Sequence, residues 1–143
     1  MSANLTILLV EDNPGDVALA RAALKASSPE CQICVARDGS QALDLLQGKG
    51  EGGDKLAPDL ILLDINMPRM DGKQLLSVLK TDKVLKTIPV VMFTSSDSPK
   101  DITDCFERHA NSYIVKPFDG RKYGDALHQI VSFWRDLSER PAK

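Results

Sequence analysis

Side chains that could bind a cation or a phosphoryl group follow four apolar runs of this chain. They are Glu11 and Asp12, Asp64, Thr94, and Lys116. Three carboxylates held close together cannot all stay ionised unless a cation joins them. Because every candidate ligand is an oxygen, we expect a hard ion such as Mg2+. An acidic pair after a strand is more often a solvated loop, so this interpretation needs a fold that brings the residues together.

Asp64 could also act as a nucleophile, because a carboxylate can form an aspartyl phosphate. The metal would then bridge a carboxylate and a phosphoryl oxygen. Lys116 would neutralise a second oxygen, and the hydroxyl of Thr94 would bond a third. Phosphoryl transfer depends mainly on positioning and on charge stabilisation, and this set of side chains supplies both.

The elements that would position these side chains alternate along the chain. The expected strands cover residues 5–10, 31–36, 59–64, 88–94 and 112–115. Capping residues and apolar residues at helical spacing follow each strand, and they predict helices that begin near Asn13, Asp38, Asp71, Ser98 and Asp119. The last helix is expected to be long and to reach about Ser138.

This alternation predicts an α/β fold, with a five-stranded parallel sheet and helices on both faces. The common five-stranded solution is the flavodoxin-like order 2-1-3-4-5, which makes the first and third strands neighbours. Ligands of such sheets bind at the carboxyl ends of the strands. We therefore expect Glu11, Asp12, Asp64, Thr94 and Lys116 at one edge of the sheet.

Length and composition limit the other possibilities. The 143 residues fit one domain, and 43% hydrophobic with 27% charged residues is a globular balance. A net charge of -2 gives no basis for a nucleic-acid partner. No apolar run approaches the ~20 residues of a membrane span, and the N-terminus has no basic region of a signal peptide. Three cysteines, an odd number, favour a reducing cytoplasm.

Four motifs, "VEDN" (10–13), "LLDINMPRMDG" (62–72), "FTSS" (93–96) and "YIVKPF" (113–118), together resemble the receiver domain of two-component response regulators. The resemblance spans nearly the whole chain. It implies a phosphorylation switch that accepts a phosphoryl group from a histidine kinase and assists its own phosphorylation and dephosphorylation, rather than an enzyme with a separate substrate.

The resemblance also implies roles for single residues. Asp64 is the phospho-acceptor and Lys116 contacts the phosphoryl group, while Thr94 and Tyr113 are the switch residues. Mg2+ is held by Asp12, Asp64 and the carbonyl of Asn66, and by Glu11 through water. Glu11 stands where many members have Asp. A cis bond is expected between Lys116 and Pro117, as cis bonds are costly except before proline.

A narrower resemblance comes from "EDNPGD", the long loop at 48–58 and "FWRDL". Together they are similar to single-domain regulators that serve bacterial and cyanobacterial phytochromes, which implies a phytochrome-type kinase. We expect residues 1–143 to form a single receiver domain. About five residues follow the last helix, which leaves no room for a DNA-binding domain. Output is therefore expected through protein contacts or competition for phosphate.

The last helix carries Tyr123, Leu127, Ile130, Trp134 and Leu137 at alternating steps of four and three. The first three are expected to pack on the sheet, and Trp134 and Leu137 to be less covered. From this we expect a homodimer through the fourth helix, fifth strand and last helix, favoured by phosphorylation of Asp64. Tyr113 could report phosphorylation by changing its rotamer.

Two other functions compete. An aspartyl-nucleophile phosphatase of the haloacid dehalogenase type needs a second Asp two residues after the nucleophile as general acid, and Asn66 stands there. A flavodoxin-like cofactor carrier needs a phosphate-binding loop after the first strand, where Glu11 and Asp12 would repel a phosphate.

Other motifs fit structural roles better. The G-x-G-x-x-G match at 48–53 follows a helix, which is the reverse of the dinucleotide context. Cys31 and Cys34 should lie on opposite faces of a strand, which argues against a zinc or redox site. His109 and His128 lie away from the acidic edge and are expected as helix-surface or packing residues.

Overall fold

The computed structural model describes residues 5–50 and 52–141. Its core is a parallel sheet in the order β2-β1-β3-β4-β5, as the sequence predicted. The strands are β1 (Thr6–Val10), β2 (Gln32–Ala36), β3 (Leu60–Leu63), β4 (Val90–Thr94) and β5 (Ser112–Val115). Strands β1 and β3 are neighbours in register, with Val10 opposite Leu63, so the residues that follow them leave the sheet side by side.

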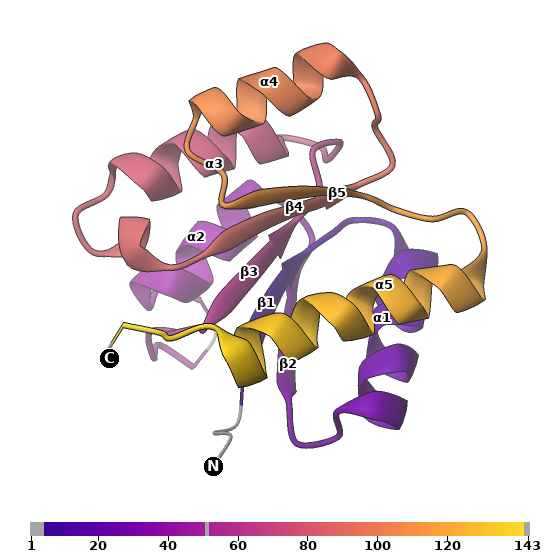
Figure 1. Ribbon diagram of the computed structural model, residues 1–143. Coiled ribbons are helices and arrows are strands. Elements are labelled where there is room, and N and C mark those ends of the chain that lie inside the picture. Colours follow the sequence, from indigo (N-terminus) through magenta and orange to yellow (C-terminus); the bar gives the residue numbers. More distant parts are fainter. Residues whose placement is uncertain (1–4, 51, 142–143) are drawn as a thin grey trace.

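Helices cover both faces of this sheet (Figure 1). Helices α1 (Pro14–Ser27) and α5 (Gly120–Ser132) lie on one face. Helices α2 (Gly39–Gln47), α3 (Gly72–Thr81) and α4 (Pro99–Glu107) lie on the other. No helix of the described residues combines the length and the hydropathy that a membrane span requires.

Each of these helices begins at a capping side chain. The caps are Asn13, Asp38, Asp71, Ser98 and Asp119. In each case the side-chain oxygen accepts a hydrogen bond from a backbone N–H of the first turn, which would otherwise lack a partner. Each cap fixes where its helix begins after the preceding strand has ended. Strand ends and helix starts therefore meet at one edge of the molecule.

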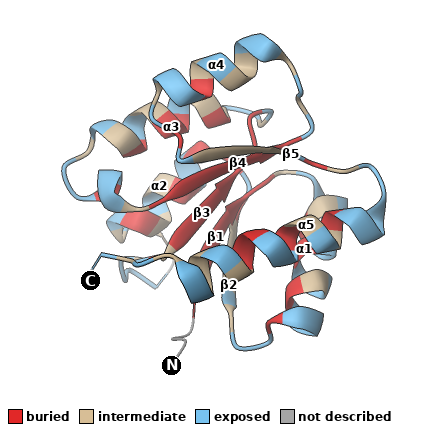
Figure 2. Cartoon of the chain, in the orientation of Figure 1, coloured by how far each residue is buried: buried red, intermediate tan, exposed pale blue. Residues whose placement is uncertain are grey.

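The strands separate two hydrophobic cores, as the central band of buried residues in Figure 2 illustrates. In β1, Ile7 and Leu9 pack toward α1 and α5, whereas Leu8 and Val10 pack toward α2 and α3. Side chains of a strand alternate between faces, so an entirely apolar strand such as β3 contributes to both cores. All four residues of β3 are fully buried. This gives the acidic edge a rigid base.

Two elements differ from the sequence-based expectation. A short 3-10 helix, η1 (Leu85–Thr87), precedes β4. The last helix leaves the α-helical path at Phe133 and continues as a π-helical turn, η2 (Phe133–Leu137), in which the N–H of Ser138 donates to the carbonyl of Phe133 over 2.9 Å. The end near Ser138 agrees with the prediction, but the path to it does not.

Trp134 is less covered than the core residues earlier in this helix, as expected, but it is not an uncovered side chain. Trp134 packs against the core beneath α1 and α5 and is only partly exposed, whereas Phe133 and Leu137 are 48% and 76% exposed. A π-turn holds more residues than an α-turn, so the residues after Ser132 are rotated about the helix axis. The uncovered pair is therefore Phe133 and Leu137.

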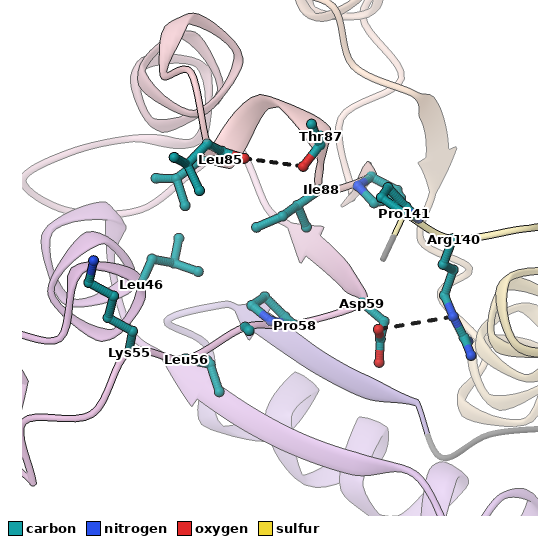
Figure 3. Close-up of a pocket in the computed structure, with 13 residues that line it drawn as sticks. Leu46, Lys55, Leu56, Pro58, Asp59, Leu85, Thr87, Ile88, Arg140 and Pro141 are labelled. Carbon is teal, nitrogen blue, oxygen red and sulfur yellow. Dashed lines mark hydrogen bonds and ion pairs between the residues drawn. The ribbon is translucent and has the colours of Figure 1, made fainter. Parts of the chain in front are cut away.

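A hollow of about 300 Å³ lies at the edge of the sheet where the strands begin, opposite the acidic edge. Figure 3 shows Leu46, Leu56, Leu85 and Ile88 around it, together with the end of the described chain. Arg140 reaches Asp59, with 4.0 Å between its Nε and the carboxylate Oδ1. The same carboxylate accepts a hydrogen bond from the N–H of Thr6.

Candidate functional site

Three acidic side chains meet where β1 and β3 end. Glu11, Asp12 and Asp64 each offer a carboxylate oxygen, and these oxygens all lie within 4.8 Å of one another. Glu11 and Asp64 are buried, with 1% and 8% of their surface exposed, while Asp12 is partly exposed. The parallel pairing of β1 with β3 produces this arrangement. Asn66, two residues past Asp64, is exposed at the same edge.

Lys116 supplies the positive charge of this site. It follows β5, is 8% exposed, and its backbone N–H donates to the carbonyl of Thr94 on the neighbouring strand over 2.8 Å. Its ammonium forms ion pairs with Glu11 and with Asp16, the latter at 2.7 Å, and lies 3.5 Å from Oδ2 of Asp64. The ammonium of Lys116 therefore contacts carboxylates from β1, α1 and the end of β3 at once.

Burial changes the proton affinities of this site. Burial raises the pKa of Glu11 to about 7; the hydrogen bond from Lys116 opposes this shift, and the charge of Asp64 adds to it. Burial alone would lower the pKa of Lys116, but hydrogen bonds to Asp16 and Glu11 and the charge of Asp64 outweigh burial and raise the pKa above its ordinary value. Lys116 therefore remains a cation at neutral pH.

The backbone around Asp64 is held tightly. The N–H of Ile65 donates to Oδ1 of Asp64 over 2.8 Å, and the N–H of Gly72 donates to the carbonyl of Ile65 over 2.8 Å. A Cβ atom at position 72 would lie 2.1 Å from the carbonyl oxygen of Asp64. Only glycine permits this approach, so Gly72 helps to set the position of Asp64.

The loop from β3 to α3 has a second anchor. Arg69 has a left-handed backbone with φ of 62°, a conformation that non-glycine residues rarely adopt. Its Nε donates to Oδ2 of Asp38 over 2.9 Å. Asp38 is 3% exposed, and it also caps α2 through the N–H of Gln41. This ion pair ties the loop that carries Asn66 to the start of α2.

Thr94 and Tyr113 share Ser96 as a neighbour. Thr94 is fully buried at the end of β4, and its hydroxyl lies 3.5 Å from the N–H of Ser96. The hydroxyl of Tyr113 donates to the carbonyl of Ser96 over 2.8 Å. The side chain of Ser96 donates to Asp101 of α4 over 2.5 Å. Ser96 therefore links Thr94, Tyr113 and α4.

A further ion-pair group connects α4 to α3. Lys73 lies 2.6 Å from Asp101 and 2.8 Å from Asp104, and these contacts hold the pKa of both carboxyls below the usual range. Asp101 also accepts the hydroxyl of Ser96. A movement of Ser96 would therefore change contacts of both α3 and α4.

Other predictions have clear outcomes in the described residues. Cys31 and Cys34 contribute to opposite cores and are free thiols, as expected, and His109 and His128 are exposed. The expected cis bond between Lys116 and Pro117 is wrong: no cis peptide bond occurs in the described chain. The trans isomer is also the intrinsically preferred one before proline.

Sequence reasoning missed three contributors to the site. Asp16 was not among the expected site residues, yet it contacts Lys116. Gly72 and Ser96 were given no role beyond their places in the motifs at 62–72 and 93–96. Asp16 lies on the first turn of α1, but no local pattern in the sequence indicated its contact with Lys116. Nothing in the sequence indicated the roles of Gly72 and Ser96.

Comparison with known proteins gives a consistent result. Residues 7–128 match the model of the family described as "Response regulator receiver domain". Response regulator Rcp1 of Synechocystis sp. (strain ATCC 27184 / PCC 6803 / Kazusa) is 38% identical over 136 residues, covering 95% of this chain and 92% of Rcp1.

Two solved structures are similar along nearly the whole chain. The phosphorylated cyanobacterial phytochrome response regulator RcpA superimposes with a TM-score of 0.92 at 36% identity, covering 98% of this chain and 100% of RcpA. The Mn2+-bound form of response regulator Rcp1 superimposes with a TM-score of 0.89 at 37% identity, covering 96% of this chain and 99% of that one.

Proposed function

The chain belongs to the response regulator receiver domain family of two-component signalling proteins, and from this we propose that Asp64 is the residue that accepts the phosphoryl group. The observation that carries the proposal is the position of Asp64, which ends β3 with Glu11 and Asp12 within 4.8 Å and Lys116 at 3.5 Å. The alternative, a phosphatase-like enzyme, lacks a general acid at Asn66.

The transfer uses the residues of this edge in separate roles. An oxygen of Asp64 attacks the phosphorus of a phosphohistidine, the P–N bond breaks, and its electron pair stays on the imidazole nitrogen, which takes up a proton. Lys116 lies close enough to neutralise one phosphoryl oxygen. The hydroxyl of Thr94 bonds another, which draws it away from the N–H of Ser96. Ser96 then passes the change to Tyr113 and α4.

We assign Mg2+ as the cation of this site. Asp12, Asp64 and the backbone carbonyl of Asn66 would hold the ion, and Glu11 would contact it through water. This oxygen-only set fits a hard divalent ion that keeps some of its waters, and the Mn2+-bound form of the relative Rcp1 supports a divalent ion. When bound, the ion offsets the negative charge of the carboxylates and of the phosphoryl oxygens.

The proposed phosphodonor is a histidine kinase of the phytochrome type in the cytoplasm. The phytochrome response regulator RcpA, at 36% identity, supports the kinase class, and the free thiols of Cys31, Cys34 and Cys105 support a reducing compartment. We propose that residues 1–143 act as one receiver domain that assists its own phosphorylation and dephosphorylation, with protein contacts as its output.

The proposed output is a homodimer through α4, β5 and α5, favoured when Asp64 is phosphorylated. Phe133 and Leu137 are exposed at the end of this face. Phe133 lines a hollow of about 500 Å³ between β5 and the last helix, together with Ile114, Ala126 and Trp134 among others. A two-fold contact would let the exposed pair of each copy pack against the hollow of the other. Tyr113 lies on the same strand, beside Ile114.

Intact-mass measurement with acetyl phosphate tests the role of Asp64. We expect the protein to gain one phosphoryl group with Mg2+ and none with a chelator, and Asp64→Asn to gain none. Asp71→Asn is the matched control, because it removes an acid from the same loop, and asparagine also caps helices. Equal phosphorylation of Asp64→Asn, or of wild type without metal, would exclude the proposed site.

A further inference from the structure

The ammonium of Lys116 is already engaged by three carboxylates, so it is not free to contact a phosphoryl group. Its ammonium has three N–H donors. It contacts Glu11 from β1, Asp16 from α1 at 2.7 Å, and Asp64 from β3 at 3.5 Å. The contact to Asp64 is at the limit of a hydrogen bond, so the ammonium lies closer to Asp16 than to the proposed phospho-acceptor. Asp16 is not one of the acids that form the metal cluster.

The carboxylate of Asp16 is aimed at Lys116 by its local structure. Its backbone N–H donates to the capping side chain of Asn13 over 3.1 Å, and its carbonyl accepts the hydroxyl of Tyr123 over 3.2 Å. Its side-chain carboxylate accepts a hydrogen bond from the ammonium of Lys116. The backbone of Asp16 therefore supports the start of α1, while its carboxylate serves the site.

We propose that Asp16 is a positioning residue that holds the ammonium of Lys116 away from Asp64 and thereby slows phosphorylation. This inference rests on the proposed function of Asp64. Lys116 must turn toward a phosphoryl oxygen when one arrives, and it must then give up or lengthen one of its present contacts.

Burial indicates which contact is given up. The side chain of Glu11 is 1% exposed, and its other oxygen accepts the N–H of Asn13 over 3.1 Å. Breaking its pairing with Lys116 would leave a buried charge without its partner, which is costly. The side chain of Asp16 is 26% exposed, so water can solvate it when Lys116 leaves. Asp16 is therefore the partner that competes with the phosphoryl group and can be released.

The negative charge of Asp16 should also slow phosphorylation. A phosphodonor such as acetyl phosphate is an anion, and it approaches an edge that already carries Glu11, Asp12, Asp16 and Asp64 against the charge of Lys116. Repulsion between two unit charges about 4 Å apart is worth about 1 kcal/mol even at the dielectric constant of water, which is a factor of about five in a rate or an equilibrium constant. We therefore expect Asp16→Asn to speed phosphorylation by about five-fold.

The experiment measures initial rates of phosphorylation by acetyl phosphate at saturating Mg2+, and the affinities for beryllofluoride and for Mg2+ alone. Asp16→Asn should be phosphorylated about five-fold faster and should bind beryllofluoride more tightly, while its affinity for Mg2+ should stay equal or fall because an anion is lost. Structural damage would instead weaken all three. Asp16→Glu restores the charge and should lie closer to wild type.

Asp119→Asn is the matched control, because Asp119 carries the same charge at the start of α5, where its carboxylate accepts the N–H groups of Arg121 and Lys122. It should leave the rate unchanged. A rate for Asp16→Asn at or below that of wild type, with Asp64→Asn still unreactive, would overturn the role of Asp16 and leave the proposed function intact. Failure of the wild type to accept any phosphoryl group would overturn both.

Discussion

Gly72 lies so close to the backbone of Asp64 that even one added methyl group would clash with it. An added Cβ would lie 2.1 Å from the carbonyl oxygen of Asp64 and 2.7 Å from the Cα of Ile65. Both are backbone atoms, which cannot turn aside as a flexible side chain can. The position of the proposed phospho-acceptor therefore depends on the absence of a side chain eight residues later.

We predict that Gly72→Ala lowers the free energy of unfolding by about 1–3 kcal/mol, the usual cost of overpacking, and also slows phosphorylation of Asp64. Gly124→Ala in α5 is the control, because its Cβ would find its nearest neighbour at an ordinary 3.6 Å. That change should stabilise the helix by about 0.5–1 kcal/mol. Urea denaturation measures the free energy of unfolding of both variants. Equal effects of the two changes would contradict the steric explanation.

Glu11 makes the metal-free protein sensitive to pH. Its pKa is raised by burial from 4.5 to about 7 in the folded protein, so between these values the folded state binds more protons than the unfolded state. Stability must then fall as pH rises through this window, by at most about 1.4 kcal/mol per pH unit for one proton. Glu11→Gln should flatten the dependence. Denaturant midpoints in chelator from pH 4.5 to 7.5 measure it, and identical slopes for both proteins would refute it.

Most of the candidate site was predictable at the level of residues because strand ends are visible in the sequence. An apolar run that stops at Glu11 or at Asp64 marks a strand end, and parallel strands place such ends at one edge. The contact of Asp16 with Lys116 was not predictable, since it joins residues 100 positions apart. It depends on the direction in which α1 leaves the sheet, which no local pattern specifies.

Among the elements, the helix starts were predictable and the last helix end was not. Capping side chains such as Asn13 and Asp71 are local signals, and both caps are present. The π-helical turn at Phe133–Leu137 has no comparable signal. Arg135 stabilises it by contacts with distant residues, donating to Ser28 over 2.9 Å and to Glu30 over 2.8 Å. The helical spacing placed Trp134 in line with Tyr123, Leu127 and Ile130, and it packs against the same core as they do. The expectation that Trp134 would be uncovered came from its position near the chain end.

We predict opposite phenotypes for two neighbours in this turn. Leu137→Ala should weaken the phosphorylation-favoured dimer and change stability by less than about 0.5 kcal/mol, since Leu137 is 76% exposed. Trp134→Ala should lower stability by about 3 kcal/mol, because the indole packs on the core.

Sedimentation with and without beryllofluoride measures the dimer, and urea denaturation measures stability. Allosteric coupling is usually worth about 1–3 kcal/mol, so the wild-type dimer should tighten by roughly 5- to 150-fold. Mass that stays monomeric in both states at high protein concentration would rule out the dimer. If Leu137→Ala leaves the dimer unaffected, the interface does not include Leu137 and lies elsewhere.

The stability of the whole molecule depends on how the negative charges at the acidic edge are neutralised. Without metal, Glu11, Asp12 and Asp64 lie within 4.8 Å of one another, and Lys116 offsets only part of their charge. We predict that Mg2+ at a hundred times its dissociation constant adds about 2.7 kcal/mol of stability.

Denaturation with and without Mg2+ tests this, and Asp12→Ala should remove most of the gain. Asp125→Ala, at an exposed position of α5, should keep it. Equal midpoints with and without saturating metal would contradict the site.

The carboxylate of Asp59 joins both ends of the described chain. It accepts the N–H of Thr6 at the start of β1 and faces Arg140, which lies near the other end. A short peptide could therefore connect the ends, and a new opening could be made at Gly52 and Gly53, whose added Cβ atoms would meet nothing within 4 Å. Such a circular permutant would emerge from the ribosome with β3 first and β2 last. Since the opening and the junction both lie away from the acidic edge, we expect the rearranged chain to assemble the same site.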